Sequence, residues 1–204
     1  MAAAPDTRRT QEERRQTTQK ALLEATVQCL VEQGYAGTTT RAVSARAGVS
    51  PGALQHHFTN KQELVAEATG HLAGKLTAQL IERGLPAAAS PRQLTEQMVD
   101  SLWQTLNGPL LVAATELAVA ARTDPFLRER FAKVQRQALE GVPLVARHLF
   151  PEQAARPDFI GLIHTLLAAI RGVVLLGFLS SADQEDVWRA TRPHLLALVE
   201  GWQG

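Results

Sequence analysis

Hydroxyl, amide and imidazole side chains gather between residues 39 and 61 of the 204-residue chain, and small residues lie among them. Side chains of these types hydrogen-bond to phosphate oxygens and to the edges of bases. Small residues beside them let a backbone approach a ligand closely. This combination indicates contact with nucleic acid, provided that the residues share one exposed face.

Capping signals in this stretch predict two short helices joined by a tight turn. Thr39 is a good N-cap for the first helix, and Gly48 tolerates the left-handed conformation that ends a helix. Ser50 is a second N-cap, and Pro51 follows it at the first helical position, where proline is favoured. A helix-turn-helix of this kind places the second helix in the major groove of DNA.

Apolar spacing indicates how these helices are held. Leu54 and Phe58 are four residues apart, so they share one buried face of the second helix. Upstream, an amphipathic helix with apolar residues from Leu22 to Leu30 is expected to end at Gly34. A further helix is expected from Lys61 to about Leu80, and it would connect this small domain to the rest of the chain.

The stretch from about Leu22 to Leu64 resembles the N-terminal DNA-binding domain of TetR-type transcriptional regulators. The resemblance rests on Gly34-Tyr35 before Thr38-Thr39, on Ala47-Gly48-Val49-Ser50, on Leu54-x-His56-His57-Phe58 and on Lys61-x-x-Leu64. One position departs from the family pattern. Gln55 stands where the family usually has tyrosine, and a glutamine is able to read adenine through two hydrogen bonds.

From the motif and the resemblance we expect three kinds of DNA contact. Thr40, Ser50 and Lys61 would hold phosphates together with the backbone near Pro51. Gly52 and Ala53 would allow close approach to the bases, and Gln55 and His56 would supply hydrogen bonds to bases or backbone. The full set of predicted DNA-binding residues is Thr39, Thr40, Arg41, Ser50, Pro51, Gly52, Ala53, Gln55, His56 and Lys61.

The remainder of the chain is predicted to be helical, so the fold class is all-α. Helices are expected from Ser90-Pro91 to about Leu106, over Leu110–Arg122, from Pro125 past Val142, over Phe159–Leu179, and from about Ser181 to Trp202. The last two helices are strongly apolar, and a single small domain cannot bury the apolar surface of both. Ala168 and Gly172 would permit close helix contact, and we interpret these helices as a dimer interface, a four-helix bundle across a two-fold axis.

The predicted organisation has three parts. Residues 1–15 form a flexible basic arm, in which Arg8, Arg9, Arg14 and Arg15 either remain solvated or touch phosphate or the minor groove. Residues 16–64 form the helix-turn-helix domain, with the helix 61–80 as its connection. Residues 81–204 form a helical domain for effector binding and dimerisation, entered through a linker at Leu85–Pro91.

Polar groups set among apolar ones suggest an effector pocket in that second part. Glu116 is the one charge in an apolar helix, and His164 and Arg171 share a stripe with apolar residues. Trp103, Phe131 and Gln135 lie on neighbouring helices. The alternative for each is an ordinary buried polar or core residue. Arg171 would favour an anionic effector and Glu116 a cationic one, so the sequence leaves the effector's charge open.

Composition limits the compartment and the partners. The net charge is +1, and residues 1–64 hold eight Lys/Arg against six Asp/Glu, so the DNA prediction depends on the motif and not on charge. The single cysteine, Cys29, excludes an internal disulfide and suits a reducing cytoplasm. It lies on an apolar stripe, where a small buried hydrophobe is the alternative to a redox sensor. No signal peptide is expected, and no apolar run approaches the length of a membrane span.

Enzyme classes find no support in the motifs. The sequence has no Glu-x-x-His pair, P-loop, Gly-x-Ser-x-Gly or zinc-ligand spacing, so no catalytic residue, metal or cofactor is expected. Two functions remain open. One is a homodimeric repressor that a small molecule releases from a pseudo-palindromic DNA operator, and the other is a helical small-molecule carrier without DNA function. The exposed polar residues of the second short helix favour the regulator.

Overall fold

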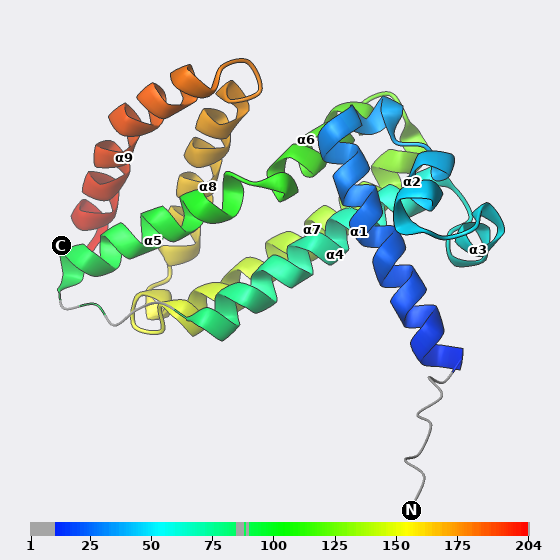
Figure 1. The fold of residues 1–204 in the computed structure, drawn as a ribbon. Helices are drawn as coiled ribbons and strands as arrows, with labels where there is room; N and C mark the ends of the chain where they lie inside the picture. The colour runs from blue at the N-terminus through cyan, green and yellow to red at the C-terminus, as the bar shows by residue number, and fades with distance from the viewer. Residues whose placement is uncertain (1–10, 85–87, 89, 204) are drawn as a thin grey trace, which may run out of the picture. The chain divides into compact units, whose positions relative to one another are not determined.

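The structure is a computed structural model and describes residues 11–84, 88 and 90–203. Within these ranges every α or β element is a helix, as predicted (Figure 1). The predicted contacts of Arg8 and Arg9, and most of the predicted linker at 85–91, lie outside the described residues. The helices are α1 (Gln11–Gly37), α2 (Thr40–Ala47), α3 (Pro51–His57), α4 (Lys61–Arg83), α5 (Pro91–Leu106), α6 (Pro109–Ala121), α7 (Pro125–Leu149), α8 (Phe159–Leu176) and α9 (Ser181–Gln203), with a short 3₁₀ helix at Gln153–Ala155.

The described chain forms two compact units. The first contains the residues up to Leu72 together with Val112–Val134, and the second contains Ala73–Leu111 and the residues from Gln135 onward. This division differs from the predicted one, which placed everything after residue 80 in one domain. Helices α4, α6 and α7 each begin in one unit and end in the other, so a division drawn along the chain misses it.

The core of the first unit holds α2 and α3 against α1 and α4. Leu22, Val43, Leu54 and Leu64 each have at most 1% of their surface exposed and belong to one cluster. Burial of a leucine or valine side chain stabilises a fold by about 1.5–3 kcal/mol. The predicted apolar stripe of α1 and the Leu54/Phe58 pair are therefore confirmed as core.

A second cluster in the same unit joins α1 and α4 to α6 and α7. Leu30, Val65, Leu117 and Leu127 are fully buried there, and Phe131 packs with them. Gly34, where α1 was predicted to end, has φ 66°, and helical turns resume after it up to Gly37. Since a left-handed φ strains residues with a Cβ, glycine suits this kink.

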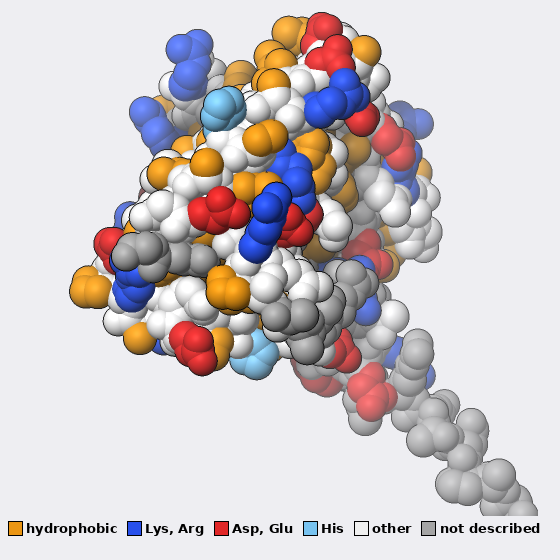
Figure 2. Space-filling view, turned by 90° about the vertical axis from the view of Figure 1, so that its left-hand side faces the viewer, with side chains coloured by type: hydrophobic (Ala, Val, Ile, Leu, Met, Phe, Trp, Pro, Cys, Tyr) orange, Lys and Arg blue, Asp and Glu red, His pale blue; other side chains and the backbone are white. Residues whose placement is uncertain are grey.

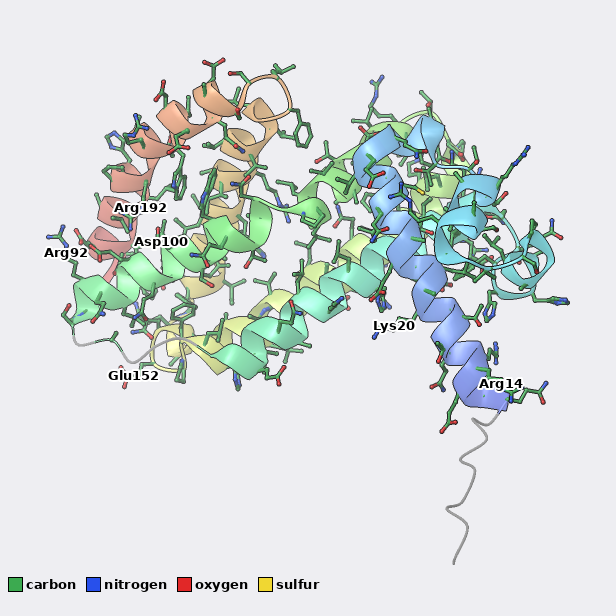
Figure 3. The ribbon with its side chains drawn as sticks, in the orientation of Figure 1. Arg14, Lys20, Arg92, Asp100, Glu152 and Arg192 are labelled. Carbon is green, nitrogen blue, oxygen red and sulfur yellow. The ribbon has the colours of Figure 1, made fainter. Side chains whose placement is uncertain are left out.

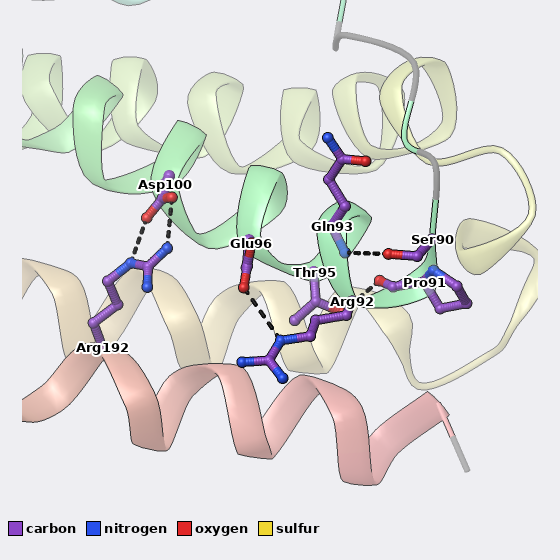
Figure 4. Close-up of polar contacts among 8 residues, drawn as sticks. All are labelled: Ser90, Pro91, Arg92, Gln93, Thr95, Glu96, Asp100 and Arg192. Atoms are coloured by element: carbon purple, nitrogen blue, oxygen red, sulfur yellow. Dashed lines mark hydrogen bonds and ion pairs between the residues drawn. The ribbon is translucent and has the colours of Figure 1, made fainter.

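The second unit is a helical assembly of α5, α8 and α9 with parts of α4 and α7. Its core includes Met98, Phe159, Leu166 and Val199. Trp103 of α5 stacks on Trp188 of α9, with ring centroids 4.0 Å apart and planes 8° from parallel. Two hydrogen bonds of 2.7 Å join the Arg192 guanidinium to the Asp100 carboxylate between the same helices (Figure 4). Aromatic stacking and a bidentate ion pair thus fix α9 on α5.

Helix α8 corrects the prediction that no run approaches the length of a membrane span. Its 18 residues have a mean hydropathy of 2.1, which meets the length and composition of a span. Leu162, Ile163 and Leu166 of this helix are buried in the core of the unit, whereas His164 and Arg171 are exposed near its middle. An exposed arginine at the centre of a span is unfavourable in lipid, so the core role accounts for the apolar sequence.

Candidate functional site

Local capping sets the geometry of α2 and α3. The Thr39 hydroxyl accepts a hydrogen bond from the Ala42 amide at 3.1 Å, and the Ser50 hydroxyl accepts one from the Ala53 amide at 3.2 Å. Gly48 ends α2 in the left-handed conformation, with φ 65°. The predicted caps and turn are confirmed, and they fix the direction in which α3 leaves the turn.

The outer face of α3 carries the polar and small residues. Gln55 and His56 are exposed, as are Ser50, Pro51 and Gly52, whereas Leu54 and Phe58 are buried beneath them. No atom of another element lies within 4 Å of a Cβ built on Gly52. A flat base edge or a phosphate therefore has open access to this turn of the helix.

The start of α2 adds exposed groups beside α3, because Thr39, Thr40 and Arg41 are all exposed. Arg46, further along α2, forms an ion pair within the protein. Its guanidinium makes two hydrogen bonds to the Glu32 carboxylate, at 2.7 and 2.5 Å, and these raise the pKa of Arg46. This ion pair between α1 and α2 was not predicted, since residues 14 apart in different helices follow no shared periodicity.

Lys61 has a partner inside the protein. Its Nζ donates to the carbonyl oxygen of Tyr35 at 2.5 Å and lies 4.0 Å from the centre of the Tyr35 ring. Burial lowers the pKa of Lys61. The ammonium group thus satisfies a carbonyl at the end of α1, and the phosphate contact predicted for it stays a prediction.

The six predicted effector residues are divided between the two units. Glu116 and Phe131 belong to the first unit, where Tyr35 donates its amide to the Glu116 carboxylate at 2.8 Å and Phe131 is core. His164 and Arg171 are exposed in the second unit, because α8 turns its opposite stripe into the core. Trp103 is half-buried in the stack with Trp188, and Gln135 is half-buried on α7.

A different pocket lies within the second unit. It has a volume of about 140 Å³, and its walls come from α4, α5, α7 and α8 and from Phe150. Most of the lining is aliphatic, and the lining contains no charged side chain. Its polar side chains are the hydroxyls of Thr77, Ser101 and Thr105. None of the six predicted effector residues is in this lining, although Leu102, the neighbour of Trp103, is.

The predicted arm is partly helical. Gln11 begins α1, so Arg14 and Arg15 lie on a helix instead of a flexible tail, and Figure 3 shows Arg14 and Lys20 projecting from its first turns. Arg15 lies 3.8 Å from Glu12. Charged side chains of both signs lie among hydrophobic side chains on the face shown in Figure 2.

Comparisons with known proteins agree with the helix-turn-helix. A family model described as "Bacterial regulatory proteins, tetR family" matches residues 22–68. An uncharacterised HTH-type transcriptional regulator of Mycobacterium bovis is 32% identical over 178 residues, which cover 81% of this chain and 88% of that protein. The regulator CymR of Pseudomonas putida is 31% identical, with 82% and 83% covered. The repressor AcnR of Corynebacterium diphtheriae is 28% identical, with 88% and 87% covered.

Solved structures share the fold over most of the chain. A transcriptional regulator from Rhodococcus has a TM-score of 0.59 at 27% identity and covers 87% of this chain and 89% of its own. The regulator FadR from Bacillus subtilis, in complex with stearoyl-CoA, has a TM-score of 0.60 at 16% identity, with 88% and 96% covered. The motif, the helical fold and these relatives agree, and the chain belongs to the TetR family of DNA-binding transcriptional regulators.

Proposed function

We propose that this regulator is a homodimeric repressor that binds a pseudo-palindromic operator and leaves it when a small molecule binds to the second unit. The main support for DNA binding is the outer face of α3, where Gln55 and His56 are exposed while Leu54 is buried. A helix that served only packing would carry apolar residues on that face. The carrier without DNA function agrees neither with this face nor with the family.

The contacts follow from the order of the residues around α3. Thr40 and Ser50 lie at the starts of α2 and α3, where hydroxyls and free amides suit phosphate oxygens. Gly52 and Ala53 bring the backbone close to the groove. Gln55, with its amide exposed, reads a base edge.

Dimerisation is argued from the apolar surface that α8 and the following residues leave exposed. Leu175, Leu176, Phe178 and Leu179 are exposed by 41, 37, 46 and 89%, and Leu198 of α9 by 43%. Large exposed apolar side chains in such numbers on two successive segments are typical of an interface. Two copies joined here by a two-fold axis would present two α3 helices to half-sites about one helical turn apart, or somewhat more.

For the effector to release DNA, it must bind more tightly to a conformation of the protein that has a low affinity for the operator. Helices α4, α6 and α7 run from one unit into the other, so a displacement in the second unit has a continuous path to α1–α3. Each tenfold loss of operator affinity needs about 1.4 kcal/mol of that preference. AcnR is named as a repressor and FadR was solved with stearoyl-CoA, which supports repression and effector binding in this chain. A regulator of this kind acts in the cytoplasm, without catalytic activity.

Footprinting on the DNA upstream of the chain's own gene tests the proposed binding of α3 to DNA. Gln55→Ala should weaken binding about tenfold or more and relax the preference at one base pair, because a bidentate base contact contributes about 1–3 kcal/mol. Gln28→Ala, at an exposed glutamine of α1, is the matched control and should bind as the wild type does. If Gln55→Ala keeps both affinity and sequence preference, this face of α3 does not read DNA.

A further inference from the structure

The pocket of the second unit has a lining that restricts the chemistry of its ligand. We propose that it binds an uncharged molecule built on a single ring with one hydroxyl group, such as a phenol or a cyclic alcohol. This inference rests on the proposed function only in treating the ligand as the effector. Its binding step is independent of DNA.

The size of the pocket sets the first limit. An apolar cavity of about 150 Å³ in a protein core holds one benzene ring. At about 140 Å³, this pocket holds a molecule of similar size and is too small to enclose the whole of a long acyl chain such as that of the stearoyl-CoA in the FadR complex. Met98, Leu102, Ile163 and Leu167 supply the apolar walls that a ring would contact.

The charge of the lining sets the second limit. None of the lining residues carries a charged side chain, so neither a carboxylate nor an ammonium group would find a counter-ion there. Moving an ion from water into such surroundings without a partner is strongly unfavourable. The part of the ligand that the pocket buries is therefore neutral. The sequence alone left the charge of the effector open, because both Arg171 and Glu116 were predicted to contact it.

Two of the three hydroxyls in the lining, those of Ser101 and Thr105, lie on α5 and define the polar group of the ligand, while the third belongs to Thr77 on α4. Ser101 and Thr105 are four residues apart, so they lie on the same side of the helix, one turn apart. The Thr105 hydroxyl donates to the Ser101 carbonyl oxygen at 2.8 Å, which leaves its oxygen as an acceptor. The Ser101 hydroxyl has no hydrogen-bond partner among the described residues and is able to donate. One donor beside one acceptor matches a hydroxyl group, which both accepts and donates.

Gly141 provides a way to fill the pocket without damaging the fold. It lies in the lining on α7, and a Cβ built there meets no atom of another element within 4 Å. Leucine is also more favourable than glycine in a helix interior. Gly141→Leu should therefore fold normally while its side chain occupies the space of the ligand. Gly74→Leu makes the same change at an exposed position of α4 outside the lining and serves as the control.

Calorimetry and thermal shift on the full-length protein without DNA test the proposal, with phenol, toluene, benzoate and palmitate as probes. Phenol should bind most tightly and toluene more weakly, while benzoate and palmitate should not bind. Gly141→Leu should abolish phenol binding and Gly74→Leu should keep it. Ser101→Ala should weaken phenol about three- to tenfold and leave toluene unchanged, since a neutral hydrogen bond contributes about 0.5–1.5 kcal/mol.

Three results would overturn the proposed ligand class. The first is that benzoate or palmitate binds more tightly than phenol, and the second is that phenol binds to Gly141→Leu as it does to the wild type. The third is that neither phenol nor toluene binds. Operator release is measured separately by adding phenol to the protein–DNA complex. Phenol that binds the free protein but does not release DNA would leave the pocket assignment standing and contradict the effector mechanism. Failure of DNA binding itself would contradict only the proposed repressor.

Discussion

The Glu116 carboxylate accepts the amide of Tyr35, a residue 81 positions away, beside the kink at Gly34. From the sequence, a lone carboxylate in an apolar helix was interpreted as an effector contact. Local periodicity identifies such a group as unusual, but it does not show which distant amide or ligand satisfies it. The Lys61 contact with the Tyr35 carbonyl was missed for the same reason.

Removing the Glu116 carboxylate should therefore destabilise the first unit. Glu116→Ala leaves the partly buried Tyr35 amide without an acceptor, which costs about 1–3 kcal/mol of unfolding free energy. Glu116→Gln keeps an acceptor oxygen at the same place and should lose much less. Urea unfolding of the two variants measures the difference. Equal stabilities would mean that water replaces the carboxylate at no loss.

Asp124 gives the first unit a pH-dependent contact. Its carboxylate accepts from the Leu127 amide at 2.9 Å and from the Gln62 side chain at 3.2 Å, and these bonds, the first above all, lower the pKa of Asp124. A carboxylate whose pKa is lower in the folded chain than in the unfolded chain stabilises the fold above its unfolded pKa. That stabilisation is lost as the pH falls through the folded pKa.

The melting temperature of Asp124→Ala should thus lie below that of the wild type at neutral pH, and the gap should narrow as the pH falls through and below the usual range of an aspartate side chain. Asp124→Asn keeps an acceptor oxygen that does not ionise, so its stability should depend less on pH. Thermal unfolding followed by circular dichroism at several pH values measures both gaps. A gap of constant size across the whole range would show that the Asp124 charge does not contribute.

Among the helices, those with local signals were predicted well. The starts of α2, α3 and α5 at Thr39, Ser50 and Ser90 could be identified because capping is a contact between near neighbours, and Figure 4 shows the Ser90 hydroxyl accepting from the Gln93 amide. The first turns of α1 were not recognised. They are mostly polar, and a helix without an apolar stripe gives no periodic signal.

Substitutions at Ser50 should separate the stability of α3 from its contact with DNA. Ser50→Ala removes the cap on the Ala53 amide and should cost about 1 kcal/mol of unfolding free energy. Ser50→Asp keeps a capping oxygen but places a negative charge on the face that we assign to phosphate. It should melt near the wild type and bind the operator more weakly. Operator affinity equal to that of the wild type would remove Ser50 from the interface.

For the chain taken as a whole, the fold class and the family could be predicted, whereas the division into units and the pocket could not. Residues 112–134 pack against α1 and α4, because Ala113, Leu117 and Leu127 share a core cluster with Leu30 and Val65. The pattern of hydrophobic residues shows that each of these helices has an apolar face. It does not show which apolar faces pack against one another. The pocket depends on where side chains leave space, which is visible only after packing.

The exposed apolar surface of α8 and α9 predicts the assembly. Replacing Leu176 and Leu198 together by glutamate should convert the proposed dimer to a monomer and reduce operator affinity, because two half-sites would no longer be bound as one unit. Leu144→Glu, at a residue of α7 that is 64% exposed, is the control and should remain dimeric. Sedimentation at micromolar concentration measures both. A wild-type chain that sediments as a stable monomer would rule out the dimer.

The parallel stack of Trp103 on Trp188 gives the protein an optical signal of its own. Two indoles 4.0 Å apart and 8° from parallel are close enough for their excited states to couple, and this coupling is sensitive to small changes in spacing and tilt. One ring belongs to α5, the helix that carries Ser101 and Thr105, and the other belongs to α9. Any sliding of α5 against α9 therefore changes the near-ultraviolet circular dichroism and the fluorescence of the unlabelled chain, so the response to a ligand can be followed in real time without a dye.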